Sequence, residues 1–139
     1  MRGRKEKPLE SVQGSTTLIA TEAVITGDIQ FSGNLDIEGR VVGSIVAEPG
    51  KEAMLRIVQG GRVEGEIRVP AAMINGTVQG DIHASQRLEL AQNAEVHGDV
   101  YYNLIEMMVG CKVNGGLRHV AETSDDLAHR REQRLQEAE

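Results

Sequence analysis

The sequence repeats one five-residue pattern six times, and this repetition restricts the fold more than any other feature. The pattern is aliphatic-x-Gly-x-aliphatic, and its copies begin at Ile25, Val41, Val63, Val78, Val96 and Val113. The glycines at the centres of successive copies are 16, 22, 15, 18 and 17 residues apart. Units of this length are typical of a solenoid, in which each repeat packs only against its neighbours.

Alternation within the pattern has a period of two, which predicts strands and not helices. Of the twelve positions flanking the glycines, only Val42 and Gly116 are not polar, so the aliphatic residues are expected to face inward. The motif glycine shares this inward parity and is expected at a corner where a side chain would not fit. A second aligned segment precedes each motif: Thr17-x-Ile19, Leu35-x-Ile37, Leu55-x-Ile57, Ala72-x-Ile74, Leu88-x-Leu90 and Ile105-x-Met107.

Two short β segments in each repeat of about 17 residues fit one coil of a β-helix. We therefore predict an all-β, single-domain β-helix of about six coils over residues 16–118. Three aromatic residues and 16 glycines leave a core of small aliphatic side chains, which suits a narrow interior of stacked layers. Residues 1–15 are predicted to be a disordered tail, and residues 119–139 a charged tail in which a short helix could begin at Thr123 or Ser124.

The six motifs, the Leu-x-Ile segments between them and the short polar tails resemble the bactofilin family over about three quarters of the chain. This resemblance implies a right-handed β-helix that assembles without nucleotide into bacterial cytoskeletal filaments. It implies a scaffold for cell-wall enzymes, morphogenesis or polar organisation, and it favours non-polar filaments with head-to-head and tail-to-tail contacts. Family members often carry phenylalanine two residues before the last motif glycine, where this chain has Val113.

The ends of the predicted rod are the expected assembly surfaces, because terminal strands without a partner invite another chain. At the N-terminal coil, the expected contact residues are Leu18, Ile19, Val24 and Ile25. At the C-terminal coil, which is the most apolar one, they are Leu104, Ile105, Met107, Met108, Val109 and Val113. We predict a homopolymer that needs no cofactor and has no nucleic-acid partner, with cell-wall or morphogenesis proteins as candidate partners.

The tails and one loop offer further candidate contacts. Arg2, Arg4, Lys5 and Lys7 make the N-terminal tail a candidate tether to anionic lipid or to a partner. The longest repeat spacing contains the turn 48–52, which is either a tolerated insertion or a docking loop. No apolar segment predicts export or a membrane span, so a cytoplasmic location is expected, with the inner membrane face as a candidate site.

The rival interpretation is a hexapeptide-repeat enzyme, an acyltransferase or a metal hydratase, because Gly27, Gly33 and Gly39 recur at intervals of six. The six-residue period then ends. A zinc site would need converging histidines, yet His83 and His97 are expected about 13 Å apart along an extended strand. We therefore predict a protein without catalytic or metal-binding residues.

Two remaining features have a structural and a functional interpretation. Cys111 aligns with Ala23, Gly61 and Ala94, so a buried structural thiol is favoured over a nucleophile. One outward column is rich in carboxylates, and it is either a solvated face or a strip for divalent cations or a basic partner. Its members are Asp28, Ser44, Glu66, Asp81 and Asp99.

Overall fold

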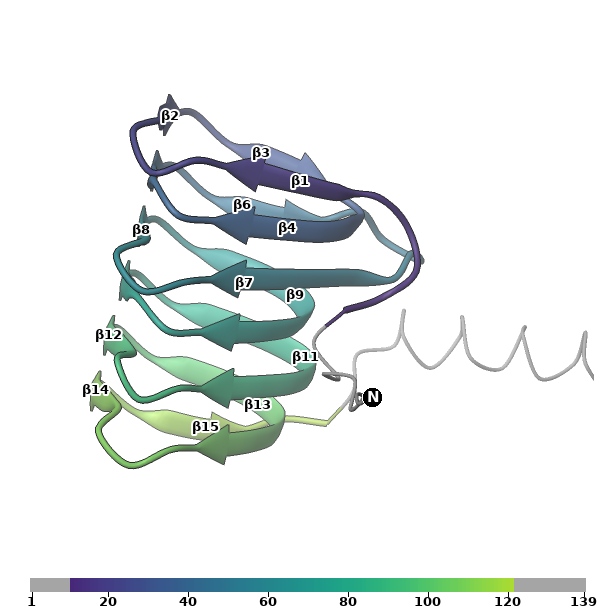
Figure 1. The fold of residues 1–139 in the computed structure, drawn as a ribbon. Coiled ribbons are helices and arrows are strands. Elements are labelled where there is room, and N and C mark those ends of the chain that lie inside the picture. The colour runs from purple at the N-terminus through teal and green to yellow at the C-terminus, as the bar shows by residue number, and fades with distance from the viewer. Residues whose placement is uncertain (1–10, 122–139) are drawn as a thin grey trace, which may run out of the picture.

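The computed structural model describes residues 11–121, which form a β-helix of six stacked coils (Figure 1). The first coil contains β1 (Thr16–Ile19), β2 (Val24–Thr26) and β3 (Ile29–Phe31). The second contains β4 (Gly33–Ile37), β5 (Arg40–Val42) and β6 (Ile45–Ala47). The third coil contains β7 (Ala53–Ile57) and β8 (Arg62–Glu64), the long strand β9 (Ile67–Ile74) runs from the third coil into the fourth, and β10 (Thr77–Gln79) belongs to the fourth. The remainder consists of β11 (Ile82–Leu90), β12 (Glu95–His97), β13 (Val100–Met107), β14 (Lys112–Asn114) and β15 (Leu117–His119).

All strand pairs are parallel, and each strand pairs with the equivalent strand of the neighbouring coil. One sheet has six strands in the order β2, β5, β8, β10, β12, β14, and the other sides of the coils form a nine-stranded sheet. From β1 in front to β3 behind, the chain turns clockwise as it moves away from the N-terminal coil (Figure 1). The coils are therefore right-handed, as the family resemblance implied.

The predicted register is confirmed column by column. Leu35 pairs with Leu55, which pairs with Ala72, and this column continues to Leu88 and Ile105. The first aliphatic residues of successive motifs also pair, as Val63 does with Val78. Each coil therefore adds one layer of aliphatic side chains to a continuous core. Side chains that are 0% exposed include Ile37, Val41, Ile45, Leu55, Ile57, Val63, Ile67, Ile74, Val78, Ile82, Leu88, Leu90, Val96 and Val100.

The motif glycines lie at one corner of every coil, as their parity predicted. Gly65 has a φ of 158°, and a Cβ placed there would overlap the carbonyl oxygen of Gly43 in the coil before it. The close stacking of backbone at this corner therefore excludes a side chain. Gly27 in the first coil has a φ of 127° but no atom within 4 Å of its hypothetical Cβ, because no coil precedes it.

The expectation of two β segments per coil was wrong, because each coil has three strands. The glycine ends the second strand, and the aliphatic residue that follows it starts a third strand on a new side. Inward alternation continues there, as Ile67 and Val69 are both buried. The motif therefore spans a corner between two strands.

The segments flanking the rod lie along its side. The main chain of Val12 exchanges two hydrogen bonds with the Asn34 side-chain amide, at 3.0 and 2.9 Å. At the other end, the N–H of Val120 donates to the Tyr102 carbonyl at 2.7 Å, and Nδ2 of Asn103 donates to the Val120 carbonyl at 3.1 Å. The predicted tail residues 1–10 and 122–139 lie outside the described part, including the candidate tether residues and the candidate short helix.

The turn 48–52 connects β6 to β7 and projects from the rod (Figure 1). It contains an ion pair between Lys51 and Glu48 at 3.6 Å and is tied to the core strands through the Phe31 carbonyl, which accepts the Glu48 N–H at 2.7 Å. Within residues 11–121, no helix is long and apolar enough to span a bilayer.

Candidate assembly surfaces at the two ends

The ladder of paired strands stops at both ends of the rod. Strands β1, β2 and β3 pair with the second coil on one edge, and β14 and β15 pair with the fifth coil on one edge. Among the described residues, no strand covers the opposite edges. Free edges of parallel strands carry backbone donors and acceptors that can pair with another chain.

The C-terminal layer exposes side chains that every inner coil buries. Met107 continues the column of Ile57, Ile74 and Leu90, which are all 0% exposed, yet Met107 is 44% exposed. Leu117 continues the column of Val100 and is 45% exposed. These side chains are exposed because no further coil covers them. Ile105 and Val113 lie in the same layer and are partly buried.

The N-terminal layer is less apolar. Ile25 is 37% exposed, whereas its partner Val41 in the second coil is fully buried. Ile19 is 9% exposed and belongs to the core, and Thr17 places a hydroxyl where other coils carry an aliphatic residue. The two end layers therefore differ in chemistry, although they occupy equivalent positions of the repeat.

Other residues expected at the ends lie on the flank. Leu18 pairs with Asp36, Val24 with Arg40 and Leu104 with Arg87, all in outward columns. These three side chains are 55%, 59% and 64% exposed. Met108 and Val109, 48% and 94% exposed, lie in the turn between β13 and β14 beside the C-terminal layer.

Comparison with known proteins identifies the family of this β-helix. The family model for bactofilins, described as polymer-forming cytoskeletal proteins, matches residues 17–118. The chain belongs to the bactofilin family. It is similar to Bactofilin BacO of Myxococcus xanthus (strain DK1622), with 33% identity over 103 residues that cover 74% of this chain and 79% of the relative. No solved structure is significantly similar to the chain.

Family membership gives this bactofilin a cytoskeletal, structural role. His83 and His97 lie on different strands, β11 and β12, which belong to different sheets. A depression of about 250 Å³ on the flank of the last two coils is lined by Arg87, Leu88, Leu104, Ile105 and Glu106. Its lining combines one guanidinium, one carboxylate and three aliphatic side chains.

Sequence reasoning missed three residues of the end layers. Leu117 closes the sixth motif, and Ile29 and Phe31 form the third strand of the first coil. Ile29 and Phe31 are partly buried and pack against the core. The inward parity of the motif, applied to the first and last copies, would have identified Leu117 and Ile29.

The column of outward carboxylates is partly a hydrogen-bond ladder between coils. Oδ1 of Asp28 accepts the backbone N–H of Ser44 at 2.9 Å, and Oδ1 of Asp81 accepts that of Asp99 at 2.9 Å. Asp99 in turn accepts the N–H of Gly116 at 2.8 Å. These aspartates therefore connect successive coils.

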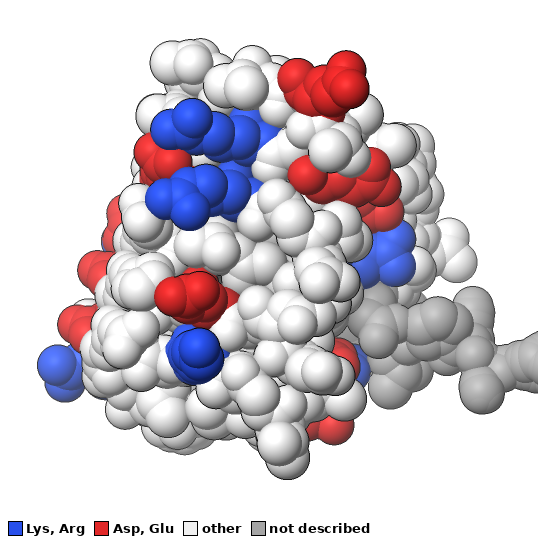
Figure 2. All heavy atoms as spheres, turned by 60° about the vertical axis from the view of Figure 1, so that its left-hand side comes forward, with Lys and Arg blue, Asp and Glu red and all other residues white. Residues whose placement is uncertain are grey.

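Charged side chains of both signs lie on the flank of the rod (Figure 2). Glu64 bridges stacked arginines of neighbouring coils, since its Oε2 lies 2.8 Å from Nε of Arg62 and 3.0 Å from Nη2 of Arg40. The hydrogen bond from Arg62, with the positive charges of Arg40 and Arg62, lowers the pKa of Glu64 below its usual range. Cys111 is a free, partly buried thiol that packs against the core in the last coil.

Proposed function

We propose that this bactofilin assembles end to end into filaments without nucleotide and serves as a structural scaffold for cell shape or cell-wall enzymes, with no catalytic activity of its own. The observation that carries the proposal is the exposure of core columns at the ends. Met107 and Leu117 are nearly half exposed where equivalent residues of inner coils are fully buried. A second copy placed on this layer would bury them and pair the free strand edges.

The centre of each contact is the terminal layer, and the flank residues form its rim. In this proposal Ile105, Met107, Val113 and Leu117 face the partner copy at the C-terminal end, and Ile19, Ile25 and Ile29 do so at the N-terminal end. Leu18, Val24, Leu104, Met108 and Val109 lie around these layers. Val113 offers less apolar surface than the phenylalanine of many relatives, so Leu117 and Met107 contribute a larger share here.

The different chemistry of the two end layers favours a non-polar filament. In head-to-head and tail-to-tail contacts each layer meets a copy of itself, so an apolar layer is matched with an equally apolar one. A head-to-tail contact would place the Thr17 hydroxyl and the backbone around it against the apolar C-terminal layer. The tail contact is therefore proposed as the stronger of the two.

Negative-stain electron microscopy of purified full-length protein tests the proposal. Filaments are expected with and without added ATP or GTP, at micromolar protein concentration and in the presence of EDTA. Protein that stays monomeric at high concentration, by analytical ultracentrifugation, would refute end-to-end assembly. Filaments that form only with nucleotide would refute the proposed independence from nucleotide.

The basic residues Arg2, Arg4, Lys5 and Lys7 are proposed to tether the filament weakly to the inner face of the cytoplasmic membrane. Each basic residue contributes about 1 kcal/mol near an anionic surface, and a filament multiplies this attraction by displaying many tails. Flotation in a density gradient with vesicles containing anionic lipid is expected to carry wild-type filaments upward with the vesicles, but not filaments in which all four residues are alanine. Equal flotation of both would exclude the tether.

A further inference from the structure

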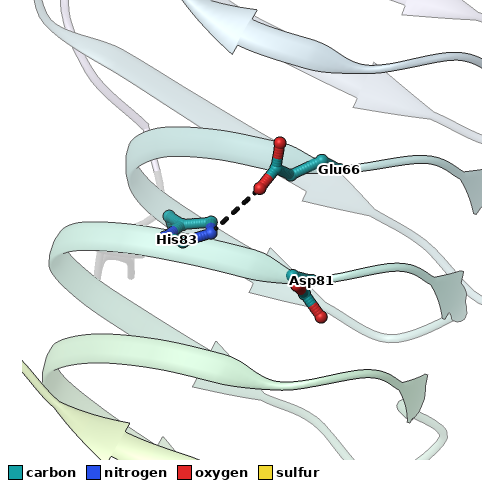
Figure 3. Close-up of side chains that lie close together, drawn as sticks. All are labelled: Glu66, Asp81 and His83. Carbon is teal, nitrogen blue, oxygen red and sulfur yellow. Dashed lines mark ion pairs between the residues drawn. The ribbon is translucent and has the colours of Figure 1, made fainter.

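Three potential metal ligands lie close together on the flank between the third and fourth coils (Figure 3). Two of them, Glu66 and His83, face each other, and the Asp81 carboxylate is turned toward the next coil. Each of Glu66, Asp81 and His83 offers one ligand atom, and these atoms all lie within 4.8 Å of one another. Glu66 and Asp81 follow the motif glycines of successive coils, and His83 lies two residues after Asp81 at the start of β11. The backbone register of the β-helix therefore brings together side chains that are 15 and 17 residues apart in the sequence.

Glu66 departs from the pattern of its own column. The aspartates of that column accept the backbone N–H of the following coil, as Asp81 does from Asp99. The longer side chain of Glu66 turns toward the next strand, where its Oε2 lies 3.1 Å from Nε2 of His83. A carboxylate can accept about four hydrogen bonds or ligands, so the bond to Asp99 leaves Asp81 with coordinating capacity.

The imidazole of His83 is held in position by a neighbour. Its ring stacks on that of Tyr101 with centroids 4.4 Å apart and an interplanar angle of 4°. In this orientation Nε2 faces the carboxylate of Glu66 (Figure 3). A histidine whose ring plane is fixed by its surroundings loses less freedom when it binds a metal ion.

We propose that Glu66, Asp81 and His83 bind one divalent cation of the zinc class, which links the third coil to the fourth. One imidazole nitrogen and two carboxylate oxygens are ligands typical of Zn²⁺, and water would complete a tetrahedral shell. Mg²⁺ and Ca²⁺ prefer oxygen ligands throughout, so the histidine selects against them. This site lies on the flank and is separate from the end surfaces.

Arg68 gives the proposal a distinctive signature. Its Nη2 lies 3.0 Å from Oε2 of Glu66, the same oxygen that faces His83. The guanidinium and a metal ion would compete for this oxygen, and Arg68 is 54% exposed, so it can move away into solvent. Removing its charge is therefore expected to strengthen metal binding, whereas removing a ligand weakens it.

Equilibrium dialysis of EDTA-treated full-length protein against Zn²⁺ tests the site, with Mg²⁺ as the comparison. We expect one Zn²⁺ per chain from this site and at least a hundred-fold preference over Mg²⁺. His83→Gln is expected to weaken this binding at least ten-fold, and Arg68→Gln to tighten it several-fold. Thermal unfolding gives a second readout, because Zn²⁺ should raise the Tm of wild type but not of His83→Gln.

His97→Gln is the matched control. Nε2 of His97 also lies 3.1 Å from a glutamate, Glu95, but this pair belongs to the other sheet and is not part of the three-residue cluster. This variant should bind Zn²⁺ like wild type. Equal losses in His83→Gln and His97→Gln, undiminished binding in His83→Gln, or weaker binding in Arg68→Gln would each overturn the proposal. Circular dichroism would show that the variants retain the β-helix.

Discussion

Replacing Leu117 by alanine is the sharpest test of the assembly surface. Leu117 lies in the C-terminal layer and keeps 45% of its surface exposed. Full burial of a leucine side chain contributes about 1.5–3 kcal/mol, so burying the remaining half contributes about 1 kcal/mol. Alanine removes most of this contribution from the contact, while the partly exposed position limits the cost to the fold itself.

The symmetry of the filament decides how large the effect is. A tail-to-tail contact contains Leu117 from both copies, so Leu117→Ala should weaken it by about 2 kcal/mol, or about thirty-fold. A head-to-tail contact contains Leu117 once, which gives about 1 kcal/mol, or about five-fold. Leu117→Asp goes further, because it places an unpaired charge in the contact. In a non-polar filament this variant should stop at dimers joined by their N-terminal ends, and in a polar filament it should stop at monomers.

Sedimentation over a range of concentrations measures the critical concentration, and analytical ultracentrifugation distinguishes dimers from monomers. Leu104→Ala is the matched control, because Leu104 belongs to the same coil and is more exposed, at 64%, but points outward to the flank. We expect it to change the critical concentration less than two-fold. An unchanged critical concentration for Leu117→Ala, or an equal change for Leu104→Ala, would refute a contact centred on the end layer.

Two further predictions concern the rod itself. Gly65→Ala should destabilise the protein by about 3 kcal/mol or more, because its Cβ would overlap the Gly43 carbonyl oxygen. Gly27→Ala lacks this overlap and should cost about 1 kcal/mol. Urea unfolding measures both costs, and equal costs would contradict the close backbone stacking at the glycine corner. The pKa of Glu64, lowered by its hydrogen bond from Arg62, should rise in Arg62→Gln when followed by NMR. Since the folded pKa is depressed, the stabilising contribution of Glu64 is present above its unfolded pKa of about 4.3 and is lost as pH falls through the folded value. A Glu64 pKa that does not change in Arg62→Gln would exclude the Arg62 contact as the cause of the lowered pKa.

The strand register could be predicted because the repeat supplies its own alignment. Aligning the motif glycines already placed Val78 beside Val63, and aligning the upstream segments, with a link two residues shorter in two repeats, placed Leu55 beside Leu35; the structure has both pairs. In a parallel β-helix equivalent residues of successive coils stack directly, so the sequence alignment of repeats is also a map of contacts. This reasoning needs only parity and spacing.

The third strand of each coil was missed because the motif was treated as one straight segment. The glycine has inward parity in the sequence, but its positive φ turns the chain, so the two aliphatic residues of a motif lie on different sides of the rod. Ile67 and Val69, or Ile82 and Ala84, continue the alternation after the corner. This alternation is the signal that could have located the additional strand.

The cluster of Glu66, Asp81 and His83 could not be predicted from spacing alone. Each repeat has its own length, between 15 and 22 residues, so a side chain's neighbours depend on where the extra residues are accommodated. The structure accommodates some of them at the turn 48–52 and others at a bulge between Ala84 and Arg87. Only with the corners in place do Glu66 and His83, on different coils, lie within reach of each other.

The ends of the rod carry information that the inner coils cannot carry. Inside the stack every coil meets a similar coil, so each layer needs only to be aliphatic and of the right size, and Val, Ile, Leu and Ala alternate freely. In the proposed filament the next layer at each end belongs to another molecule, and any departure from the repeat changes which molecule fits. Thr17 and Met107 are such departures, since their columns are otherwise filled by Leu, Ile or Ala. Exchanging the two residues between the ends would therefore alter assembly far more than exchanging any two inner residues of the same columns.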